Sequence, residues 1–441
     1  MQHIRRLTRF LSVFVGRIYS RFRARVSAAH SPHSEFTPRL REPVREQLTK
    51  FLQDSTYPSF WFLSWTTWFS NAFQRPQQLA LALAELGHAV VYYEPWEFEP
   101  TFVATSLAKC RDFVGLREIQ PKLGLLRCPR TELPYFITTA QPQVALLTWP
   151  READLISSAV RSLVVYEMVD HHDLMGEGTM ALKDLHLKWV RQADVMLVTA
   201  DALLEEVRPY RSDVIVLPNG VSPHHWRPRA MPVPRDLAPA REAAAIIGYF
   251  GAVAPWFDWN LWTYAARRHP EWSFVLVGLP YQVSSTEIAS YAESSPNIHF
   301  LGPKPYADLP SYALHFDVAT IPFMLNAITH ACSPVKLFEY LAMGKPIVAT
   351  AMREVVKYPW VQTAATPPEF VAALERAVAT KDDPREVCAR IELAQAHTWR
   401  SRATVLRDAI RRASSLQNHI PRRAIASQNG LENVGRSFSG R

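Results

Sequence analysis

The sequence predicts an α/β protein of two domains, each a parallel sheet covered by helices on both faces. Short apolar runs alternate with helical patterns from residue 60 onward. A proline-rich stretch at 222–243 interrupts this alternation. The chain has 441 residues, 48% hydrophobic and 20% charged, which allows two or three domains. The same composition excludes a disordered or collagen-like chain.

In the first half, apolar runs between turn residues indicate strands, and apolar residues recurring every three or four positions indicate helices. A helix starting at Arg75 is marked by Pro76 in its first turn and by Gly87 just past its end. We expect strands at 60–65, 89–93, 144–148, 163–169, 195–199 and 214–217, and helices at 75–87 and 180–192.

The second half repeats the pattern after the proline-rich linker. Strands are expected at 246–250, 274–277, 298–301, 318–321 and 347–349, and helices at 259–268, 309–314 and 335–343. We therefore divide the chain into a basic segment (1–50), a first domain (51–221), the linker (222–243), a second domain (244–395), a helix (396–414) and a disordered tail (415–441). Ligands of such folds usually bind at the carboxyl ends of the strands, in the cleft between the domains.

The net charge of +8 is concentrated at the two ends of the chain. Residues 1–50 carry eleven Lys or Arg and three acidic residues, residues 401–441 carry eight and two, and the stretch between them has a net charge of −6. A basic body would favour a nucleic-acid partner. This body is mildly acidic and has no basic groove rich in aromatic residues, so we expect no nucleic acid.

Residues 1–26 contain seven arginines and no acidic residue. At 100° per residue, the apolar side chains from Ile4 to Phe22 fall within one arc and five arginines lie opposite. This pattern is typical of a helix on an anionic membrane surface. A secretory signal or anchor is an alternative, although Arg17 interrupts its apolar run, and a flexible basic arm or partner helix is another. We expect a cytoplasmic protein, peripheral on the inner face of the cytoplasmic membrane.

Several classes of site lack their usual signals. Cys110, Cys128, Cys332 and Cys388 form no CxxC pair, which favours free thiols in a reducing cytoplasm. The motifs GxGxxG, GxxxxGK[ST], HExxH and GxSxG are absent, and no run of eighteen uncharged apolar residues occurs. No Asp-x-Asp pair exists, so we expect no metal bound by carboxylates to grip phosphates.

The most informative stretch is 330–349, HACSPVKLFEYLAMGKPIVA. A loop ends at Ser333-Pro334 and a helix follows. Free N–H groups at a helix start suit a diphosphate, and Lys336 adds a positive charge in the first turn. Glu339, one turn further, suits the paired hydroxyls of a ribose. By themselves these residues fit equally well an ordinary capped helix with Lys336 and Glu339 in solvent.

Together with Gly248-Tyr249-Phe250-Gly251-Ala252, this stretch resembles the nucleotide-sugar domain of retaining, family-4-type glycosyltransferases with the GT-B fold. The PNGV sequence at 218–221 and the stretch 193–200 match the end of the first domain in that family. Stretches 73–79 and 251–258 look like a bacterial branch concerned with cell-surface polysaccharides. The resemblance covers about residues 60–410 and implies two Rossmann-like domains facing across a cleft.

The resemblance also implies roles for individual residues. The donor, a nucleoside-diphosphate sugar, would bind at Gly251, Ser333, Pro334, Val335, Lys336 and Glu339, with the diphosphate on the 333–336 turn and the ribose on Glu339. Gly251 would let the backbone approach the phosphates, because a side chain there would collide with them.

Residues of the first domain are expected on the other side of the cleft. Asp170 and His171 end a strand there and would contact the donor sugar or the acceptor, forming a catalytic set with Lys336. His171 and His172 fit equally well as surface histidines. Arg75 and Gln78 are candidates for contacts to the acceptor or a phosphate, although Arg75 fits equally well as a donor to carbonyls.

Two departures from the family pattern affect this interpretation. Ala331 stands where the family has the first of two glutamates, and Pro255-Trp256-Phe257-Asp258 replaces the Arg and Lys that grip the diphosphate. Lys336, with Arg75 or Lys304 as further candidates, would have to supply that charge.

We therefore expect a retaining, metal-independent glycosyltransferase. It would move a sugar from its nucleotide donor to a glycan acceptor, lipid-linked, in cell-surface polysaccharide synthesis, with no further cofactor. A GT-B module without turnover, binding a glycan or a partner enzyme, is the alternative favoured by Ala331 and the missing basic pair. A sugar-nucleotide epimerase on the same fold is a third hypothesis.

Overall fold

The computed structural model describes residues 57–64, 66, 68, 73–94, 125–129, 143–150, 162–171, 180–293 and 295–419. The expected membrane-surface helix within residues 1–26 and the chain beyond 419 lie outside these residues, as does His172. In the part of the chain that is described, no helix is long and apolar enough to cross a membrane.

The first domain contains a seven-stranded parallel sheet in the order β3-β2-β1-β4-β5-β6-β7. Its strands are β1 (Phe60–Leu63), β2 (Val90–Glu94), β3 (Leu125–Pro129), β4 (Val144–Leu147), β5 (Leu163–Met168), β6 (Val195–Val198) and β7 (Val214–Val216). The helices are α3 (Arg75–Glu85), α6 (Met180–Gln192) and α7 (Asp201–Val207). Strands β1, β4 and β6 are buried along their whole length, as expected for a parallel sheet covered on both faces.

The second domain contains a six-stranded parallel sheet in the order β10-β9-β8-β11-β12-β13. Its strands are β8 (Ile246–Phe250), β9 (Ser273–Val277), β10 (Ile298–Phe300), β11 (Val318–Ile321), β12 (Ile347–Thr350) and β13 (Val361–Ala364). The helices are α9 (Trp259–Arg268), α10 (Ser285–Glu293), α11 (Leu309–Ala313), α12 (Ala327–His330), α13 (Val335–Ala342) and α14 (Pro367–Ala379), with a 3-10 turn, η4 (Tyr306–Asp308).

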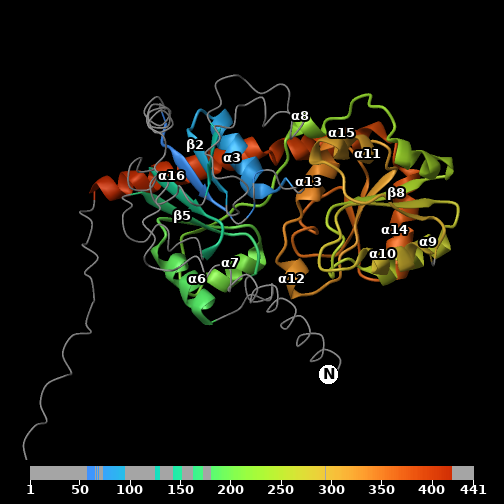
Figure 1. Cartoon of the computed structure of the whole chain (residues 1–441), viewed down its shortest axis with the longest axis horizontal. Helices are drawn as coiled ribbons and strands as arrows, with labels where there is room; N and C mark the ends of the chain where they lie inside the picture. The colour runs from blue at the N-terminus through green and yellow to red at the C-terminus, as the bar shows by residue number, and fades with distance from the viewer. Residues whose placement is uncertain are drawn as a thin grey trace, which may run out of the picture.

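The strand order reverses between β1 and β4 in one sheet and between β8 and β11 in the other. Parallel α/β sheets bind ligands at such reversals, outside the carboxyl ends of the strands. Gly251 directly follows β8, so it lies at the reversal in the second sheet. Figure 1 shows the two domains side by side, with α13 and α12 near their junction.

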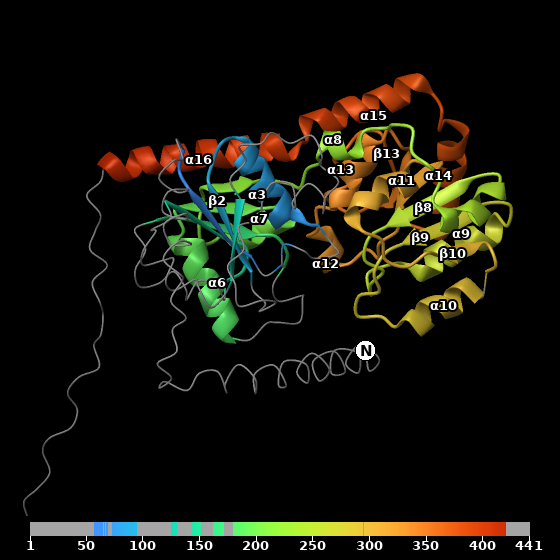
Figure 2. The same cartoon turned by 45° about the horizontal axis from the view of Figure 1, so that its top comes forward.

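The linker and the C-terminal helices differ from the sequence-based expectation. The linker contains helix α8 (Pro223–Trp226), whose Trp226 is fully buried, and a 3-10 helix, η3 (Arg235–Glu242). After α15 (Pro384–Ala396), helix α16 (Trp399–His419) returns to the first domain and packs against α3 (Figures 1 and 2). The expected end of this helix at 414 was wrong, because the helical pattern continues to His419.

Backbone contacts hold this return in place. The N–H of Val221 donates to the carbonyl of His397 at 3.0 Å, and the N–H of Trp399 donates to the carbonyl of Val221 at 3.0 Å. A Cβ at Gly220 would lie 2.9 Å from the His397 carbonyl oxygen, so this close approach requires glycine. The PNGV stretch therefore joins the first domain to the C-terminal helices.

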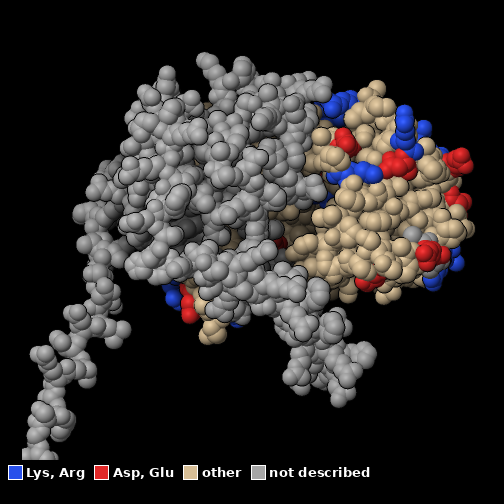
Figure 3. Space-filling model, viewed as in Figure 1, with Lys and Arg blue, Asp and Glu red and all other residues tan. Residues whose placement is uncertain are grey.

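The face of the second domain seen in Figure 3 carries acidic and basic side chains interspersed around a broad uncharged area. Nucleic-acid binding surfaces instead gather Lys and Arg into a patch or stripe. This face therefore offers no such stripe.

Candidate active site

Lys336 and Gly251 lie together at the N-terminal end of α13. Gly251 has φ +131°, and a Cβ placed on it would be 2.8 Å from Cε and 3.0 Å from Nζ of Lys336. The ammonium lies over two aromatic rings, 5.0 Å from the centroid of Tyr249 and 4.7 Å from that of Phe323. Gly251 is thus needed here for its backbone conformation and for the space that Lys336 fills.

The Lys336 ammonium has no carboxylate partner among the described residues. Burial lowers the pKa of its side chain to about 8, because the charged form loses hydration, and the charges of Cys332 and Glu339 offset only part of this effect. The aromatic faces offset part of this cost. A cation held in this way attracts an anion, and the N-terminal end of α13 adds to the attraction.

Asp170 approaches this site from the first domain. It lies just beyond the end of β5, is half-buried, and burial raises its pKa to about 6. The pKa of the Cys332 thiol rises to about 12, first through burial and next through the negative charge of Asp170, while Lys336 lowers it. Asp170 of the first domain and Lys336 of the second thus both act on the Cys332 thiol, with opposite signs.

His171 contacts a residue of its own domain. Its Nε2 lies 3.0 Å from Oε2 of Glu206 on α7, and its side chain is one quarter exposed. The surface alternative for His171 thus matches the geometry better than a role beside Lys336.

Ser333 joins the two domains. The backbone N–H of Asn219 donates to the Ser333 hydroxyl at 3.2 Å, and its side-chain amide donates to the Ser333 carbonyl at 2.5 Å. Pro334 then caps α13, and Val335 is its first residue. This turn anchors the PNGV stretch of the first domain.

Glu339 is buried, with 3% of its surface exposed. Its Oε1 accepts a hydrogen bond of 2.8 Å from the hydroxyl of Tyr306. Burial raises the pKa of Glu339 to about 7, and the bond from Tyr306, the charge of Lys336 and a bond from Trp226 oppose the rise. The alternative that placed Glu339 and Lys336 on a solvated helix face is therefore wrong.

The residues that replace the family's missing charges serve the hydrophobic core. Ala331 is buried and packs with the first-domain cluster that includes Trp61 and Leu147. Phe257 is buried, and the Asp258 carboxylate caps α9 by accepting the N–H of Leu261 at 3.0 Å. Lys336 is thus the cation that the described residues place against Gly251.

Other protein groups bind the polar side chains of three candidate residues, Arg75, Gln78 and Lys304. Arg75 is buried, and it donates to Glu167 at 2.6 Å, to Asn219 at 3.1 Å and to the carbonyl of Pro218 at 3.1 Å. Gln78 donates to the Tyr306 hydroxyl at 2.8 Å, and Lys304 pairs with Asp236 at 2.7 Å.

These contacts correct the sequence-based roles of the same three residues. Arg75 stabilises the first domain through a carbonyl and a buried ion pair, so its phosphate role is withdrawn in favour of the alternative. The Lys304 ammonium is occupied by its own ion pair with Asp236. Gln78 contacts Tyr306 of the second domain, and its side-chain oxygen accepts from Ser222 of the linker.

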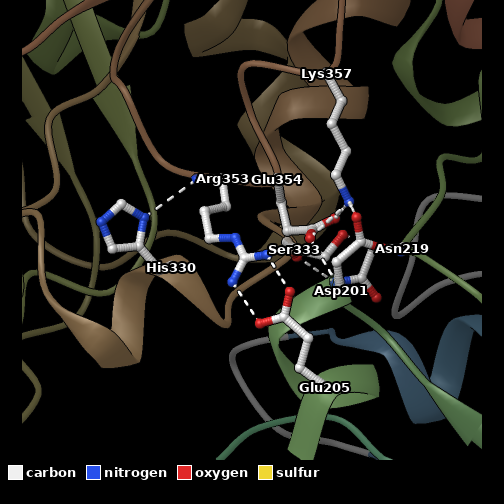
Figure 4. Close-up of polar contacts among 8 residues, drawn as sticks. All are labelled: Asp201, Glu205, Asn219, His330, Ser333, Arg353, Glu354 and Lys357. Atoms are coloured by element: carbon white, nitrogen blue, oxygen red, sulfur yellow. Dashed lines mark hydrogen bonds and ion pairs between the residues drawn. The ribbon is translucent and has the colours of Figure 1, made fainter. Parts of the chain in front are cut away.

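A second set of polar contacts fixes the domains at the start of α7 (Figure 4). The guanidinium of Arg353 makes two hydrogen bonds with Glu205, at 2.6 and 2.8 Å. Lys357 lies 2.7 Å from both Asp201 and Glu354. Glu354 also accepts the backbone N–H of Asp201 at 2.8 Å. These hydrogen bonds and ion pairs join the loop after β12 to the first domain.

No group of three or more His, Cys, Asp or Glu side chains suited to a metal ion occurs within the described ranges. The donors that surround the site there are a lysine, backbone N–H groups at a helix start and hydroxyl groups, a set suited to an anionic ligand.

Residues 245–380 match the family model described as glycosyl transferases group 1. The match lies within the second domain. The match covers β8 to α14, which includes Gly251, Lys336 and Glu339.

Further likenesses extend beyond the second domain. Over 228 residues, 49% of this chain, the sequence is 27% identical to the putative teichuronic acid biosynthesis glycosyltransferase TuaH of Bacillus subtilis strain 168. The chain spans 57% of that relative's length. Sucrose-phosphate synthase from Thermosynechococcus elongatus has a TM-score of 0.62 at 14% identity, covering 81% of this chain and 99% of that one.

A second solved structure, Anabaena HepE in complex with UDP and glucose, has a TM-score of 0.58 at 14% identity, covering 81% of this chain and all of that one. These likenesses confirm the expected GT-B fold of two α/β domains.

Sequence reasoning missed Tyr306, Trp226 and Glu354. Tyr306 and Trp226 lie near Glu339 only after folding, because 33 residues separate Tyr306 from Glu339 and Trp226 belongs to the linker. Glu354 sits in a loop without a recognisable motif. The one usable signal was Asn219, whose PNGV motif was noted as a domain end rather than as a contact.

Proposed function

We propose that the protein is a glycosyltransferase. It moves a sugar from a nucleoside-diphosphate sugar to a glycan acceptor in cell-surface polysaccharide synthesis. The observation that carries this proposal is the Lys336 ammonium, which has no carboxylate partner among the described residues and lies beside Gly251 at the start of α13. The group 1 family match of residues 245–380 and the TuaH likeness support the reaction class.

In the proposed reaction, Lys336 and the free N–H groups of α13 stabilise the departing diphosphate. The bond between the sugar C1 and the phosphate oxygen breaks, and the acceptor oxygen bonds to C1 on the same face, so the configuration is retained. The acceptor hydroxyl proton passes to the leaving phosphate oxygen. No metal ion and no separate protein base take part.

Two carboxylates complete the proposed site. Glu339 accepts the ribose hydroxyls with the oxygen that Tyr306 does not occupy, and it does so in its ionised form. Asp170 reaches the site from the first domain and contacts the donor sugar or the acceptor hydroxyl. Closing the two domains therefore completes the site.

The acceptor and the cellular location are part of the same proposal. The acceptor is lipid-linked, and residues 1–26 hold the protein on the anionic inner face of the cytoplasmic membrane. Sedimentation with anionic vesicles tests the membrane contact by comparing the full chain with a chain lacking residues 1–30. Equal pelleting of the two would remove this part of the proposal.

Thermal unfolding with UDP, GDP, ADP and TDP, in the presence of EDTA, tests donor binding. A nucleoside diphosphate at a hundred times its dissociation constant adds about 2.7 kcal/mol to the free energy of unfolding. We expect one base to stabilise the wild-type protein and the effect to vanish in Lys336→Met.

Lys304→Met is the matched control for this test. Lys304 belongs to the same domain and also lies over an aromatic ring, that of Tyr312 at 5.7 Å, but it is paired with Asp236. Its substitution should leave nucleotide binding unchanged. Stabilisation that persists fully in Lys336→Met would contradict the assignment of Lys336.

The alternative is a GT-B module that binds a glycan or a partner enzyme without turnover. Ala331, buried against the first domain in place of the family glutamate, is the observation that favours it. Such a module would release no nucleoside diphosphate when an acceptor is added, whereas a transferase would.

A further inference from the structure

Tyr306 lies at the meeting point of both domains and the linker. It starts η4 in the second domain, and its side chain is buried. Its hydroxyl donates to Glu339 Oε1 at 2.8 Å, and it accepts from Gln78 Nε2 at 2.8 Å and from Trp226 Nε1 at 2.8 Å. Gln78 comes from the first domain on α3, and Trp226 comes from the linker.

The hydrogen-bonding capacity of this hydroxyl is filled. A phenol has one proton and two acceptor sites. The indole N–H of Trp226 and the amide N–H of Gln78 occupy both acceptor sites, because these groups only donate. The proton of Tyr306 is therefore directed to Glu339, and the bond to a carboxylate is of the stronger, charge-assisted kind.

The tyrosine ring is also held from its faces. The ring of His225 stacks on it, with centroids 4.7 Å apart and planes 17° from parallel, and Phe73 lies 5.6 Å away on the first-domain side. His225 Nε2 further lies 3.2 Å from the Tyr306 carbonyl oxygen. The hydroxyl thus has little freedom to turn away from Glu339.

We propose that Tyr306 is a positioning residue that orients the Glu339 carboxylate toward the donor. Through Gln78, this orientation depends on the closed arrangement of the two domains. The proposal rests on the glycosyltransferase function proposed above. If the domains separate, Gln78 leaves with the first domain and the hydroxyl loses one of the two donors that direct its proton. Donor recognition in the second domain then depends on contact with the first.

The elements packed against α13 carry further titratable and charged groups. Lys336 and Tyr340 lie on α13 itself, and His225 of α8 is neutral near pH 7 because burial lowers its pKa to about 4. Helix α15 packs on α13 and contributes Arg390, which is paired with Glu386 at 2.7 Å. Among the influences that oppose burial, the bond from Tyr306 is the largest, so its loss should raise the pKa of Glu339 further.

The variant Tyr306→Phe removes the hydroxyl and keeps the ring. Tyr312→Phe is the matched control, since it removes an O–H bond of 2.8 Å to a carboxylate, Asp236, in the same domain. The first readout needs no ligand: the infrared C=O band of protonated Glu339, assigned by its loss in Glu339→Gln, is followed against pH. We expect a midpoint near 7 in the wild type and the control, and a midpoint about one pH unit higher in Tyr306→Phe.

The second readout is the dissociation constant of the nucleoside diphosphate that binds best in the panel. At pH 7, Tyr306→Phe should bind it about tenfold more weakly, and the loss should shrink at pH 9, where Glu339 is ionised in both proteins. The control should bind normally. Gln78→Leu should shift both readouts in the same direction by a smaller amount, and it carries the test if Tyr306→Phe does not fold.

The outcomes separate the two proposals. An unchanged midpoint together with unchanged binding in Tyr306→Phe overturns the positioning role. A shifted midpoint in Tyr306→Phe with none in Gln78→Leu overturns the coupling to the first domain. If no nucleoside diphosphate binds the wild-type protein, the glycosyltransferase proposal fails. The infrared titration still decides whether Tyr306 controls the pKa of Glu339.

Discussion

Glu354 caps a helix of the other domain, and this contact makes the closed arrangement testable. Its side chain is 1% exposed and accepts the backbone N–H of Asp201, the first residue of α7, at 2.8 Å. The cap residue of that helix, Ala200, has no side chain that could do so. Substituting Glu354 by Ala should therefore expose the start of α7 and weaken the polar contacts between the domains.

The magnitude follows from the contacts that are lost. A missing helix cap costs about 1 kcal/mol. The pair with Lys357 adds about 0.5 kcal/mol, discounted because the lysine is 36% exposed. Lost packing of the buried side chain adds about 0.5 kcal/mol. The sum, about 2 kcal/mol, corresponds to about a thirtyfold change in an opening equilibrium.

Amide hydrogen exchange at Asp201 and the next two residues is the assay. Exchange in Glu354→Ala should be about thirtyfold faster than in the wild type. Glu354→Gln keeps an oxygen for the cap and should show a much smaller effect. Glu205→Gln, which breaks the exposed pair with Arg353 in the same interface, should leave these amides unchanged. Identical exchange in Glu354→Ala and the wild type would refute the capping of α7 by Glu354 and the contact between the domains at this point.

Three further predictions concern stability. Arg75→Met should lower the free energy of unfolding by about 3–5 kcal/mol in chemical denaturation, since it leaves the fully buried Glu167 carboxylate without its cation, and adding Glu167→Gln should restore part of the loss. Gly278→Ala should lower the melting temperature and weaken nucleotide binding, because its Cβ would lie 1.7 Å from the Gly251 carbonyl oxygen, and a neutral result would contradict the close packing of these two turns. His225 has a pKa lowered by burial to about 4, so its contribution to stability is complete above pH 6.5 and is lost as the pH falls toward 4, by at most about 3 kcal/mol. His225→Gln should flatten the acid limb of stability against pH, and an unchanged limb would exclude this source.

The periodic elements could be predicted from the sequence because their own residues carry the pattern. The bounds of α6, α9, β8 and β11 agree with those expected from apolar spacing. Elements without a strong pattern were not anticipated. Helix α7 is short and receives its cap from Glu354 in the other domain, so no local residue marks its start. The docking of α16 on α3 depends on contacts between distant segments.

The site was predictable where one segment carries it. The nearness of Lys336 and Gly251 followed from the family pattern, since a helix start and a strand end of one sheet meet at the same edge. The partner of Arg75 was not predictable, because Glu167 lies 92 residues away and an arginine at a helix start fits several roles. Tyr306 escaped notice for the same reason, as its three partners come from α3, α8 and α13.

The measurement that most directly tests the central claim is acceptor-dependent release of nucleoside diphosphate. Wild-type protein and Lys336→Met are incubated in EDTA with a sugar nucleotide of the base that binds, with and without glycan lipids extracted from bacterial membranes. The proposal predicts release that requires the acceptor lipids, survives EDTA and is lost in Lys336→Met. Nucleotide that binds tightly but is never released as diphosphate, with any lipid fraction, would contradict transfer and favour a binding module.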